Sequence, residues 1–346
     1  MTLKIQTYDG TIDRGDWGAF VQAHPDGSIF QMPWMYEVYE KTRHQKPVAF
    51  FAFENQQLVG LVVAVNFWNS FFPLSVFTRR QIVLGGPLVL NNDIGVLLAL
   101  VETLVQHTET EAIYTEIRNL RLGLSYKPVY EEAGFYYESH LRVGVDMKRK
   151  TGEMWASLSP DRQKNIKRLK KVDQSVRELS TKEEVMGAWK IFRCTIGEQG
   201  RPVPHHTLFK AICNSDDLRT QVKFRGFFPG DHMKAAAMVM MLKSRAFIWY
   251  EGSCLPPDQE WMYDGFLWSI ISELQDEGYQ YIDMGDGGRP GKDQLTRQYK
   301  KSYGGMIRET GRYTYVHNWF LWHVGRTFFY WYKKVRIFVF THFCRQ

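Results

Sequence analysis

Cysteine is scarce in this chain, and long uninterrupted apolar runs are missing. Its four cysteines, Cys194, Cys213, Cys254 and Cys344, are far apart and form no Cys-x-x-Cys pair. This spacing argues against a zinc site and a disulfide scaffold and fits a reducing compartment. With no apolar run of about 18 residues, no membrane-spanning helix is expected. The first residues also lack the apolar segment of a signal peptide, so a cytoplasmic protein is predicted.

Two common nucleotide-binding signatures are absent as well, namely the P-loop and Gly-x-Gly-x-x-Gly. The 346 residues are 44% hydrophobic and 23% charged, which indicates a globular protein long enough for two domains. The formal net charge is +7. Such an excess favours an anionic partner, such as a phosphorylated substrate, a nucleic acid or an acidic lipid. A basic surface that binds no such partner would give the same net charge.

One unit recurs along the chain at a spacing of 167 residues. The strand-like segments Tyr114–Ile117 and Tyr281–Met284 stand at this spacing, and each follows a helix-like segment. Gly85 and Gly252, each at the end of a strand-like run, have the same spacing. Hairpin-like pairs of alternating segments precede both. The pattern predicts a duplicated α/β (α+β) fold with mixed sheets flanked by helices.

We therefore predict a first domain over residues 1–147, a second over 148–312 and a tail over 313–346. The second domain begins with a helix that has Ser159 as N-cap and Pro160 at its first position. Its basic residues are Arg162, Lys164, Lys167, Arg168, Lys170 and Lys171. A charge run of this kind is usually a solvated face. The alternative is a cationic wall for a phosphate-rich substrate.

The tail has a composition of its own, because no acidic residue follows Glu309. Apolar residues recur there at helical spacing, and basic residues fall on the other side. The apolar set is Phe320, Val324, Phe328, Trp331, Val335 and Phe338. One or two helices are predicted over about 317–343. Their apolar side packs either on the protein's own core or on an anionic membrane surface.

The stretch 279–305 carries the strongest functional signal. It predicts a buried strand, a glycine-rich turn, a short basic helix and a Gly-Gly stop. The turn glycines Gly285, Gly287 and Gly288 would let the backbone approach a ligand and expose its N–H groups. Lysines and a helix N-terminus beside such a backbone favour an anion. An ordinary strand–loop–helix connection would show the same pattern.

This stretch resembles the C-terminal signature of the Fem family of peptidoglycan-bridge aminoacyltransferases, within the Gcn5-related N-acyltransferase superfamily. The family pattern is Asp-(hydrophobic)-Gly-Gly, a loop, and Phe-Lys-x-x-Phe-Gly-Gly. Here it stands as Asp283-Met284-Gly285-Asp286 and Tyr299-Lys300-Lys301-Ser302-Tyr303-Gly304-Gly305. Three weaker matches follow the family's order: Phe30-Gln31-x-Pro33-Trp34, Trp155-x-x-Leu158 with Arg162-x-x-x-Ile166-Lys167-Arg168, and Thr195-x(5)-Arg201.

The chain departs from the bridge-forming enzymes in places. Tyrosine replaces both phenylalanines, and Asp286 replaces the second glycine. Where those enzymes often have Asp-Pro after the first-domain strand, this chain has Arg118-Asn119. The last departure resembles acetyltransferase-like relatives associated with polysaccharide synthesis.

The resemblance implies two tandem Gcn5-related domains. It implies an N-acyltransferase that moves an acyl or aminoacyl group to an amine on a cell-wall or surface-polysaccharide precursor. The donor would be acyl-coenzyme A or aminoacyl-tRNA, and the sequence leaves this choice open. The partners would be a phosphorylated cell-envelope precursor and, for the second donor, tRNA. No metal is expected, and the location would be cytoplasmic, at the inner face of the membrane if the tail docks there.

Residue by residue, the resemblance implies that Lys300 contacts the phosphate-bearing donor and that Arg201 holds the acceptor's phosphates. A solvent-exposed helix lysine and a loop arginine are the plain alternatives. The remaining predicted binding residues are Tyr299, Gly285, Gly287, Gly288, Gly304 and Gly305.

Three carboxylates are candidate bases for the acceptor amine. Asp283 and Glu116 stand in the two recurring strands, and Glu251 follows Trp249-Tyr250 near a strand end. Asp283 and Glu116 could equally pair with a nearby base or cap a helix.

A rival interpretation is a non-catalytic module that binds RNA or anionic lipid on a degenerate transferase fold. The net charge and the aromatic, basic tail would serve it directly. An open cleft next to Lys300 and Arg201 would favour the enzyme.

Overall fold

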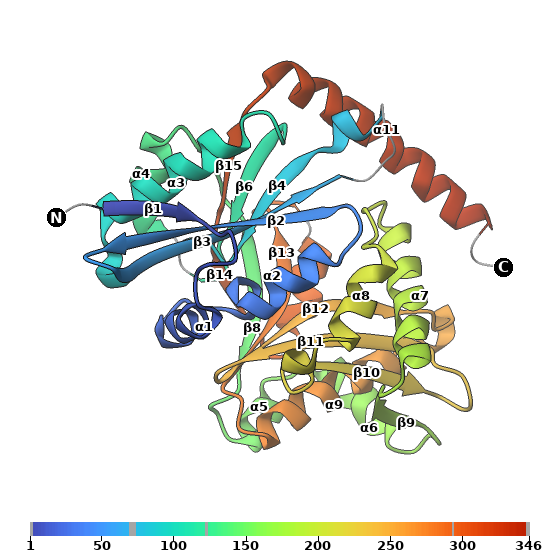
Figure 1. Ribbon diagram of the computed structural model, residues 1–346. Coiled ribbons are helices and arrows are strands. Elements are labelled where there is room, and N and C mark those ends of the chain that lie inside the picture. The colour runs from blue at the N-terminus through green and yellow to red at the C-terminus, as the bar shows by residue number, and fades with distance from the viewer. Residues whose placement is uncertain (1–2, 69–73, 122–123, 293, 344–346) are drawn as a thin grey trace. The chain divides into compact units, whose positions relative to one another are not determined.

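A computed structural model describes residues 3–68, 74–121, 124–292 and 294–343 (Figure 1). Cys344, singled out in the sequence, lies outside this part, and the side chain of Phe338 is not described. The chain forms two compact units, Met1–His140 with Glu309–Trp331 and Leu141–Arg308 with Tyr332–Gln346. Each contains one mixed sheet flanked by helices, which confirms the predicted fold class.

The first sheet has the strand order β1-β2-β3-β4-β6-β15-β7, with β5 paired to β3. Among the described strands of this sheet only β4 and β6 run parallel, and α3 (Ile94–Thr108) lies between them in the chain. The strands are β1 Leu3–Thr7, β2 Gln45–Glu54, β3 Gln57–Phe67, β4 Arg80–Leu84, β5 Leu88–Val89, β6 Tyr114–Arg118, β7 Tyr136–Glu138 and β15 Arg312–Val316. The other helices of this unit include α1 Arg14–Ala23, α2 Pro33–Glu40 and α4 Lys127–Glu132.

Helices cover both faces of this sheet, which explains why β2 and β3 are apolar almost throughout. Along β2, Val48, Phe50 and Ala52 belong to the core cluster that contains α3. Phe51 points to the opposite face, where its ring lies 4.9 Å from that of Trp17 in α1. Successive residues of a strand therefore enter two separate cores.

The second sheet has the order β14-β8-β13-β12-β11-β10-β9. Here β12 and β13 are the parallel pair, and α9 (Met262–Asp276) connects them. The strands are β8 Leu141–Asp146, β9 Ser175–Glu178, β10 Val222–Phe228, β11 Ala235–Leu242, β12 Arg245–Ser253, β13 Tyr281–Gly288 and β14 Met306–Glu309. Its helices are α5 Thr151–Ala156, α6 Pro160–Leu169, α7 Lys182–Glu198, α8 His206–Cys213 and α10 Gln294–Lys301, besides α9.

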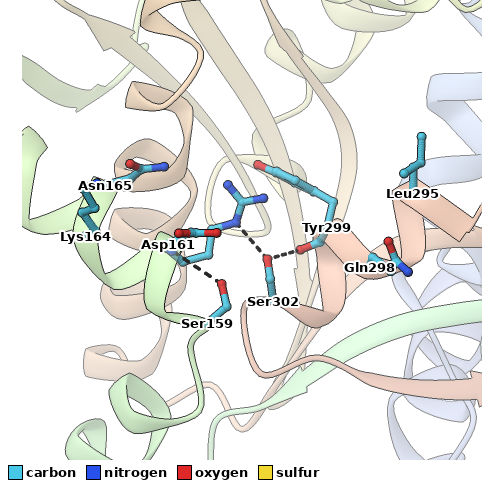
Figure 2. A pocket seen from close by; sticks show the side chains of 9 residues that line it. Ser159, Asp161, Lys164, Asn165, Leu295, Gln298, Tyr299 and Ser302 are labelled. Carbon is cyan, nitrogen blue, oxygen red and sulfur yellow. Dashed lines mark hydrogen bonds between the residues drawn. The ribbon is translucent and has the colours of Figure 1, made fainter.

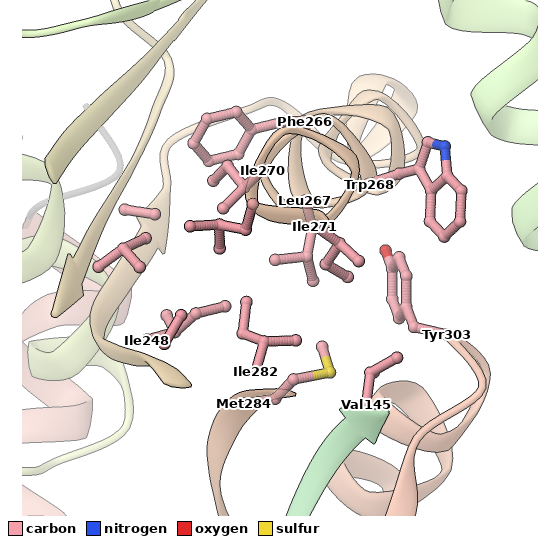
Figure 3. Packing of buried hydrophobic residues seen from close by; sticks show 14 of the residues in the cluster. Val145, Ile248, Phe266, Leu267, Trp268, Ile270, Ile271, Ile282, Met284 and Tyr303 are labelled. Atoms are coloured by element: carbon pink, nitrogen blue, oxygen red, sulfur yellow. The ribbon is translucent and has the colours of Figure 1, made fainter. Parts of the chain in front are cut away.

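The core of the second unit lies between this sheet and α9. Phe266, Leu267, Ile270 and Ile271 of α9 meet Ile248, Ile282 and Met284 of the parallel strands (Figure 3). Tyr303, from the turn after α10, closes the cluster and is fully buried. This core fixes the two parallel strands and α10 against the same helix.

The two sheets share one topology, as the recurring pattern predicts. In each, a meander of antiparallel strands leads to a parallel pair joined by one helix, and an antiparallel strand flanks the second member. The register refines the repeat. Thr115 pairs with Gln81, whereas Ile282, which is 167 positions further on, pairs with Ala246, only 165 positions beyond Gln81. If the two units are aligned by this ladder, Gly85 therefore does not correspond to Gly252, whereas the repeat of 167 residues predicts that it does.

The units divide at other residues than the sequence pattern predicts. β15 pairs with β6 and β7 of the first sheet, although the prediction divides it between the last residue of the second domain and the start of the tail. Conversely, β8 pairs with β13 of the second sheet. The chain thus leaves the first unit before β8 and returns to it with β15. Strand partners of this kind are set by long-range hydrogen bonds, which leave no periodic signal in the sequence.

The tail forms one helix, α11 (Trp319–Phe343), within the predicted range. Several of its large side chains are exposed, among them Phe320 at 75% and Trp331 at 59%. Trp322 packs on Tyr114, with ring centroids 4.6 Å apart. No helix in the described part of the chain is both long and apolar enough to cross a bilayer.

A buried polar chain fixes the segment that leads into α11. His317 Nε2 lies 2.8 Å from Thr115 Oγ1, which donates to Gln81 Oε1. Gln81 Nε2 in turn donates to Thr108 Oγ1 in α3. Thr115 has one proton and gives it to Gln81, so His317 Nε2–H is the donor in the first bond.

The stability of the protein should fall in mild acid because of His317. Burial lowers the pKa of His317 to about 4, below the ordinary value of 6.5. The folded state therefore prefers the neutral ring, and this contribution is complete above pH 6.5 and disappears as the pH falls toward 4. We expect the free energy of unfolding to fall by about 2 kcal/mol, a value that already allows for the partial exposure of the ring. Urea unfolding from pH 7 to 4.5 measures it.

His317→Gln should flatten this pH dependence, and His323→Gln, at an exposed position of α11, should not. Equal pH dependence in the wild type and His317→Gln would contradict the assignment.

Candidate active site

The parallel pairing between β12 and β13 stops early. It covers only Arg245–Phe247 against Tyr281–Asp283, although β12 continues to Ser253 and β13 to Gly288. The first unit differs at the same place. There β4 and β6 pair as far as Leu84 and Arg118, and Gly85 N still donates to Arg118 O. The parallel ladder of the second unit thus ends before its strands do, unlike that of the first unit. We call the unpaired stretch after Phe247 and Asp283 the gap.

A β-bulge in β12 lies at this gap. Met238 of β11 faces Tyr250 and the next residue, Val239, faces Ile248, so Trp249 is the extra residue. A bulge re-aims the side chains that follow it. Glu251 consequently points to the face covered by α9, where Tyr263 O–H donates to its Oε2 at 2.8 Å. Burial first, and then the nearby charge of Glu251, raises the pKa of Tyr263.

The predicted glycine-rich turn is largely strand. β13 runs through Gly285, Gly287 and Gly288, and its register with β8 shifts twice between Asp283 and Gly288. Gly285 and Gly288 have φ values of +86° and +72°, which only glycine adopts at little cost. Gly287 packs tightly, since a Cβ would lie 3.1 Å from Leu141 O. The segment is thus the irregular end of a strand, and the chain turns only after Gly288.

Lys300 lies at this edge rather than in solvent. It is 8% exposed, and its Nζ donates to Met284 O at 2.6 Å and Asp286 O at 2.9 Å. Burial lowers the pKa of Lys300, and the charges of Glu251 and Asp286 oppose this shift. The ammonium supplies donors to carbonyls that have lost a ladder partner. An ammonium has three N–H groups, and these bonds use two of them.

A second basic side chain of α10, that of Arg297, also points toward β13. Arg297 is also 8% exposed and donates through Nη1 to Gly287 O and Arg289 O, both at 2.8 Å. The helix is therefore fixed to the irregular strand by two buried cations. Gly304 and Gly305 end it, as predicted. A Cβ there would lie 2.2 Å from Ser157 Oγ and 2.7 Å from Lys300 O, respectively.

Asp283 is held in an ion pair. Arg142 of β8 contacts both of its carboxylate oxygens at 2.9 Å, and Gly285 N donates to Oδ1 at 2.7 Å. Both side chains are largely buried, at 12% and 9% exposure for Arg142 and Asp283. The ion pair joins β8 to the irregular part of β13, so the carboxylate of Asp283 has a structural role.

Glu116 is in the other unit and is similarly occupied. It forms ion pairs with Arg118 and Arg312. Burial opposes ionisation, but the two guanidinium groups hold the pKa of Glu116 below its ordinary value. The space beyond this strand pair is filled by Gln31, whose Nε2 donates to Gly86 O at 2.7 Å. Of the three candidate carboxylates, Glu251 alone lies at the gap without an arginine partner in the described part of the chain.

A pocket of about 500 Å³ lies between α6 and α10 (Figure 2). It is lined by Ser159, Asp161, Arg162, Lys164, Asn165, Leu295, Gln298, Tyr299 and Ser302. Burial first, then the charges of Asp264 and Glu251, raises the pKa of Tyr299. Tyr299 connects this pocket to Tyr303, because the two hydroxyl oxygens lie 3.1 Å apart. Neither Lys300 nor Arg201 lines it.

A buried network forms one wall of this pocket. Asp264, 1% exposed, accepts from Arg162 Nη1 at 2.5 Å, Asn165 Nδ2 at 2.7 Å and Tyr303 O–H at 3.0 Å. Arg162 also donates to Ser302 Oγ at 2.8 Å, and its guanidinium lies 4.4 Å from the Tyr299 ring centre. The sequence indicated the basic helix but not Asp264, because nothing marks one acid of α9 as buried.

Arg201 lies in an exposed loop after α7. Its backbone N donates to Ile196 O at 3.1 Å, and its side chain has no ion pair within the described ranges. The same ranges contain no cluster of three His, Cys, Asp or Glu that could hold a metal ion.

The two units share one arrangement of strands, which allows the whole chain to be compared with known proteins. Comparison with protein-family models and with curated protein sequences gives no match. Solved structures do match. FemX superposes with a TM-score of 0.69 at 12% identity, over 92% of this chain and 99% of FemX.

Two further structures agree with this fold. L-PGS from Bacillus licheniformis has a TM-score of 0.56 at 13% identity, over 91% of this chain and 96% of that one. A Pyrococcus horikoshii protein, whose assignment as an acetyltransferase is provisional, has a TM-score of 0.52 at 11% identity, over 91% and 89%. These likenesses confirm the Fem-like fold that the sequence pattern predicts.

Replacing Lys300 should weaken the fold and not only ligand binding. Lys300→Ala leaves two carbonyls of β13 without a donor, which should cost about 3 kcal/mol of unfolding free energy. Lys301→Ala, at the exposed neighbouring position, is the control and should change little. Urea unfolding of both variants checks this. A Lys300→Ala variant as stable as Lys301→Ala would show that the carbonyl contacts contribute nothing.

Proposed function

We propose that this protein is an N-acyltransferase whose reaction takes place at the gap between β12 and β13. The observation that carries the proposal is the early end of the parallel ladder, with a bulge and a carboxylate beside it. The first unit has the same topology but a continuous ladder and a filled end. A difference of this kind suits a binding site in the second unit and a supporting role for that part of the first.

Glu251 is the base in this proposal. The nitrogen of the acceptor amine attacks the donor carbonyl, a C–N bond forms, and the amine proton passes to Glu251. The thioester or ester bond of the donor then breaks, and the departing sulfur or oxygen takes the proton back. Tyr263 donates a hydrogen bond to Glu251 Oε2 and so holds the carboxylate in position. Asp283 and Glu116 act in this scheme only as ion-pair partners of strands.

The donor approaches from the pocket beside Tyr299. Lys164 lines it and has no ion pair in the part of the chain that the structure describes. Asn165, Gln298 and Ser302 offer further hydrogen bonds. This lining suits the polar, phosphate-bearing portion of acyl-coenzyme A or of the aminoacylated end of tRNA. Lys300 has a third N–H that would stabilise negative charge on the donor carbonyl oxygen.

The acceptor class follows from the Fem-like sequence pattern. We propose an amine on a phosphorylated cell-wall or surface-polysaccharide precursor, with Arg201 as a contact for its phosphates. The exposure of Arg201 supports this role. A charge-assisted phosphate contact is worth roughly 1.5–3 kcal/mol, so Arg201→Ala should raise the acceptor KM and leave kcat nearly unchanged.

Glu251→Gln tests the reaction. Turnover is followed with radiolabelled acetyl-coenzyme A and with radiolabelled aminoacyl-tRNA, each offered with a nucleotide-linked amino sugar. A positioned base contributes about 10² to 10⁴ in rate, so kcat should fall by that factor. Glu260→Gln, at an exposed glutamate before α9, should keep full activity.

Wild-type kcat in Glu251→Gln would exclude this residue as the base. Transfer from neither donor, together with no nucleotide-bearing ligand in mass spectra of the purified protein, would favour the rival interpretation of a binding module.

We also propose that α11 holds the protein at an anionic membrane surface. No acid follows Glu309 in the sequence, while exposed Phe320 and Trp331 offer apolar area to a bilayer. Each lysine or arginine near an anionic surface adds about 1 kcal/mol. Such binding weakens in salt, because surface charges are screened over about 8 Å at physiological ionic strength.

Vesicle co-sedimentation checks this docking. The double variant Phe320→Ser and Trp331→Ser should lose about 3 kcal/mol of partition free energy. Ile94→Ser, an exposed apolar position on α3, is the control. Truncation after Asn318 is a second test, because a cut at Gly311 would also remove β15 from the first sheet. Equal pelleting of all forms at low salt would refute docking.

A further inference from the structure

A second pocket, of about 270 Å³, lies in the first unit, where β3 ends and β4 begins. It is lined by Lys46, Asn66, Phe67, Trp68, Ser75, Arg79, Thr110 and Glu111. None of these residues belongs to the proposed reaction site. Two of its lining residues are buried and polar, since Asn66 is 5% and Ser75 is 7% exposed. Phe67 and Trp68 are half-buried and add apolar surface.

The charges of this pocket leave one cation unmatched. Glu111 is occupied at both oxygens, by Lys46 Nζ at 2.6 Å and by Asn66 Nδ2 at 2.5 Å. Arg79 is exposed, and its guanidinium has no ion pair within the described segments. Lys46 and Glu111 cancel, so Arg79 gives the pocket a net charge of about +1. This charge matches a phosphodiester, which carries one negative charge.

The hydrogen-bonding groups narrow the class of ligand. Ser75 and Thr110 are hydroxyls, and Asn66 is an amide whose buried Oδ1 has no partner in the described part of the chain. An unpaired buried acceptor is costly, and a hydroxyl donor would satisfy it. The one carboxylate is already paired, so an ammonium group would find no counter-ion. The lining therefore suits an uncharged polyol next to the phosphate.

The pocket lies beside the start of α11. Arg79 O accepts from Ile113 N at 3.2 Å, and Ile113 O accepts from His317 N at 2.9 Å. Further along the helix, a Cβ on Gly325 would lie 3.0 Å from Phe77 O. The segment that leads into β4 thus approaches α11 at Gly325 and is linked through Ile113 to His317, just before the helix (Figure 1). Exposed Trp319 and Phe320 stand on the same helix.

We propose that this pocket binds the head group of an anionic phospholipid with a polyol head, such as phosphatidylglycerol, while α11 lies on the bilayer. Arg79 contacts the phosphodiester, Asn66 and Ser75 bind the polyol hydroxyls, and Trp68 contacts the glycerol backbone. The proposal rests on the membrane docking of α11 and adds a site that selects the lipid.

Short-chain lipids test the site without a membrane. Dihexanoyl phosphatidylglycerol and dihexanoyl phosphatidylcholine are titrated below their micelle concentrations, and binding is followed by NMR and calorimetry. We expect the glycerol lipid to bind more tightly, and Arg79→Gln to weaken it roughly tenfold. Lys4→Gln removes one exposed charge from β1 of the same unit and is the matched control.

The outcomes separate this site from the docking of α11. Loss of vesicle binding in the Phe320→Ser, Trp331→Ser variant, with short-chain lipid binding intact, supports both proposals. If the wild type binds the short-chain lipid but not vesicles, docking fails and the head-group site stands. Equal affinity for the two lipids, equal weakening by Arg79→Gln and Lys4→Gln, or no binding to the wild type overturns the site.

Discussion

A buried strand that loses its neighbour must find other donors for its carbonyl groups, and the second unit is organised around this requirement. After Asp283, β13 has no further pairing to β12, and Lys300 and Arg297 supply the missing donors. This need draws two cations of α10 inward and fixes the helix on the strand. The carbonyls of β13 beside the gap are thereby satisfied without a ladder partner from β12. The motif Tyr-Lys-x-x-Tyr-Gly-Gly thus includes the lysine that attaches α10 to β13.

The duplication makes the role of the gap clearer, since it provides an internal comparison. Both units have a parallel pair joined by one long helix, yet in the second the ladder stops while both strands continue. In the first, Gln31 fills the end of the pair and binds Gly86 O. The Phe-Gln-x-Pro-Trp segment, which resembles the family's N-terminal pattern, thus closes one copy of the fold. In the function that we propose, the first copy serves as a framework and the second carries the reaction.

Much of the fold could be predicted from periodicity and spacing, because helices and strands leave local signals. The duplication, the capped basic helix and the C-terminal helix are examples. Strand exchange was not predictable, since β15 reaches β6 through hydrogen bonds between residues about 200 positions apart. At the site, the sequence indicated Lys300 and the three carboxylates but could not say which were occupied. Arg142 and Arg312 lie far from Asp283 and Glu116 along the chain, so only the folded structure brings these ion pairs together.

The net charge of +7 is a poor guide to where anions bind. In the second unit Arg142, Arg162, Arg297 and Lys300 are committed to carboxylates or carbonyls of the protein itself. Arg142 and Arg162 are neutralised by their carboxylates and so add little to the outward field. Three cations without an ion pair in the described part of the chain stand in the places considered above: Lys164 in the pocket beside α10, Arg201 in its loop and Arg79 in the pocket of the first unit. Recognition of anions therefore depends on the position of single charges in shaped pockets, and screening by salt should affect the exposed helix more than the pockets.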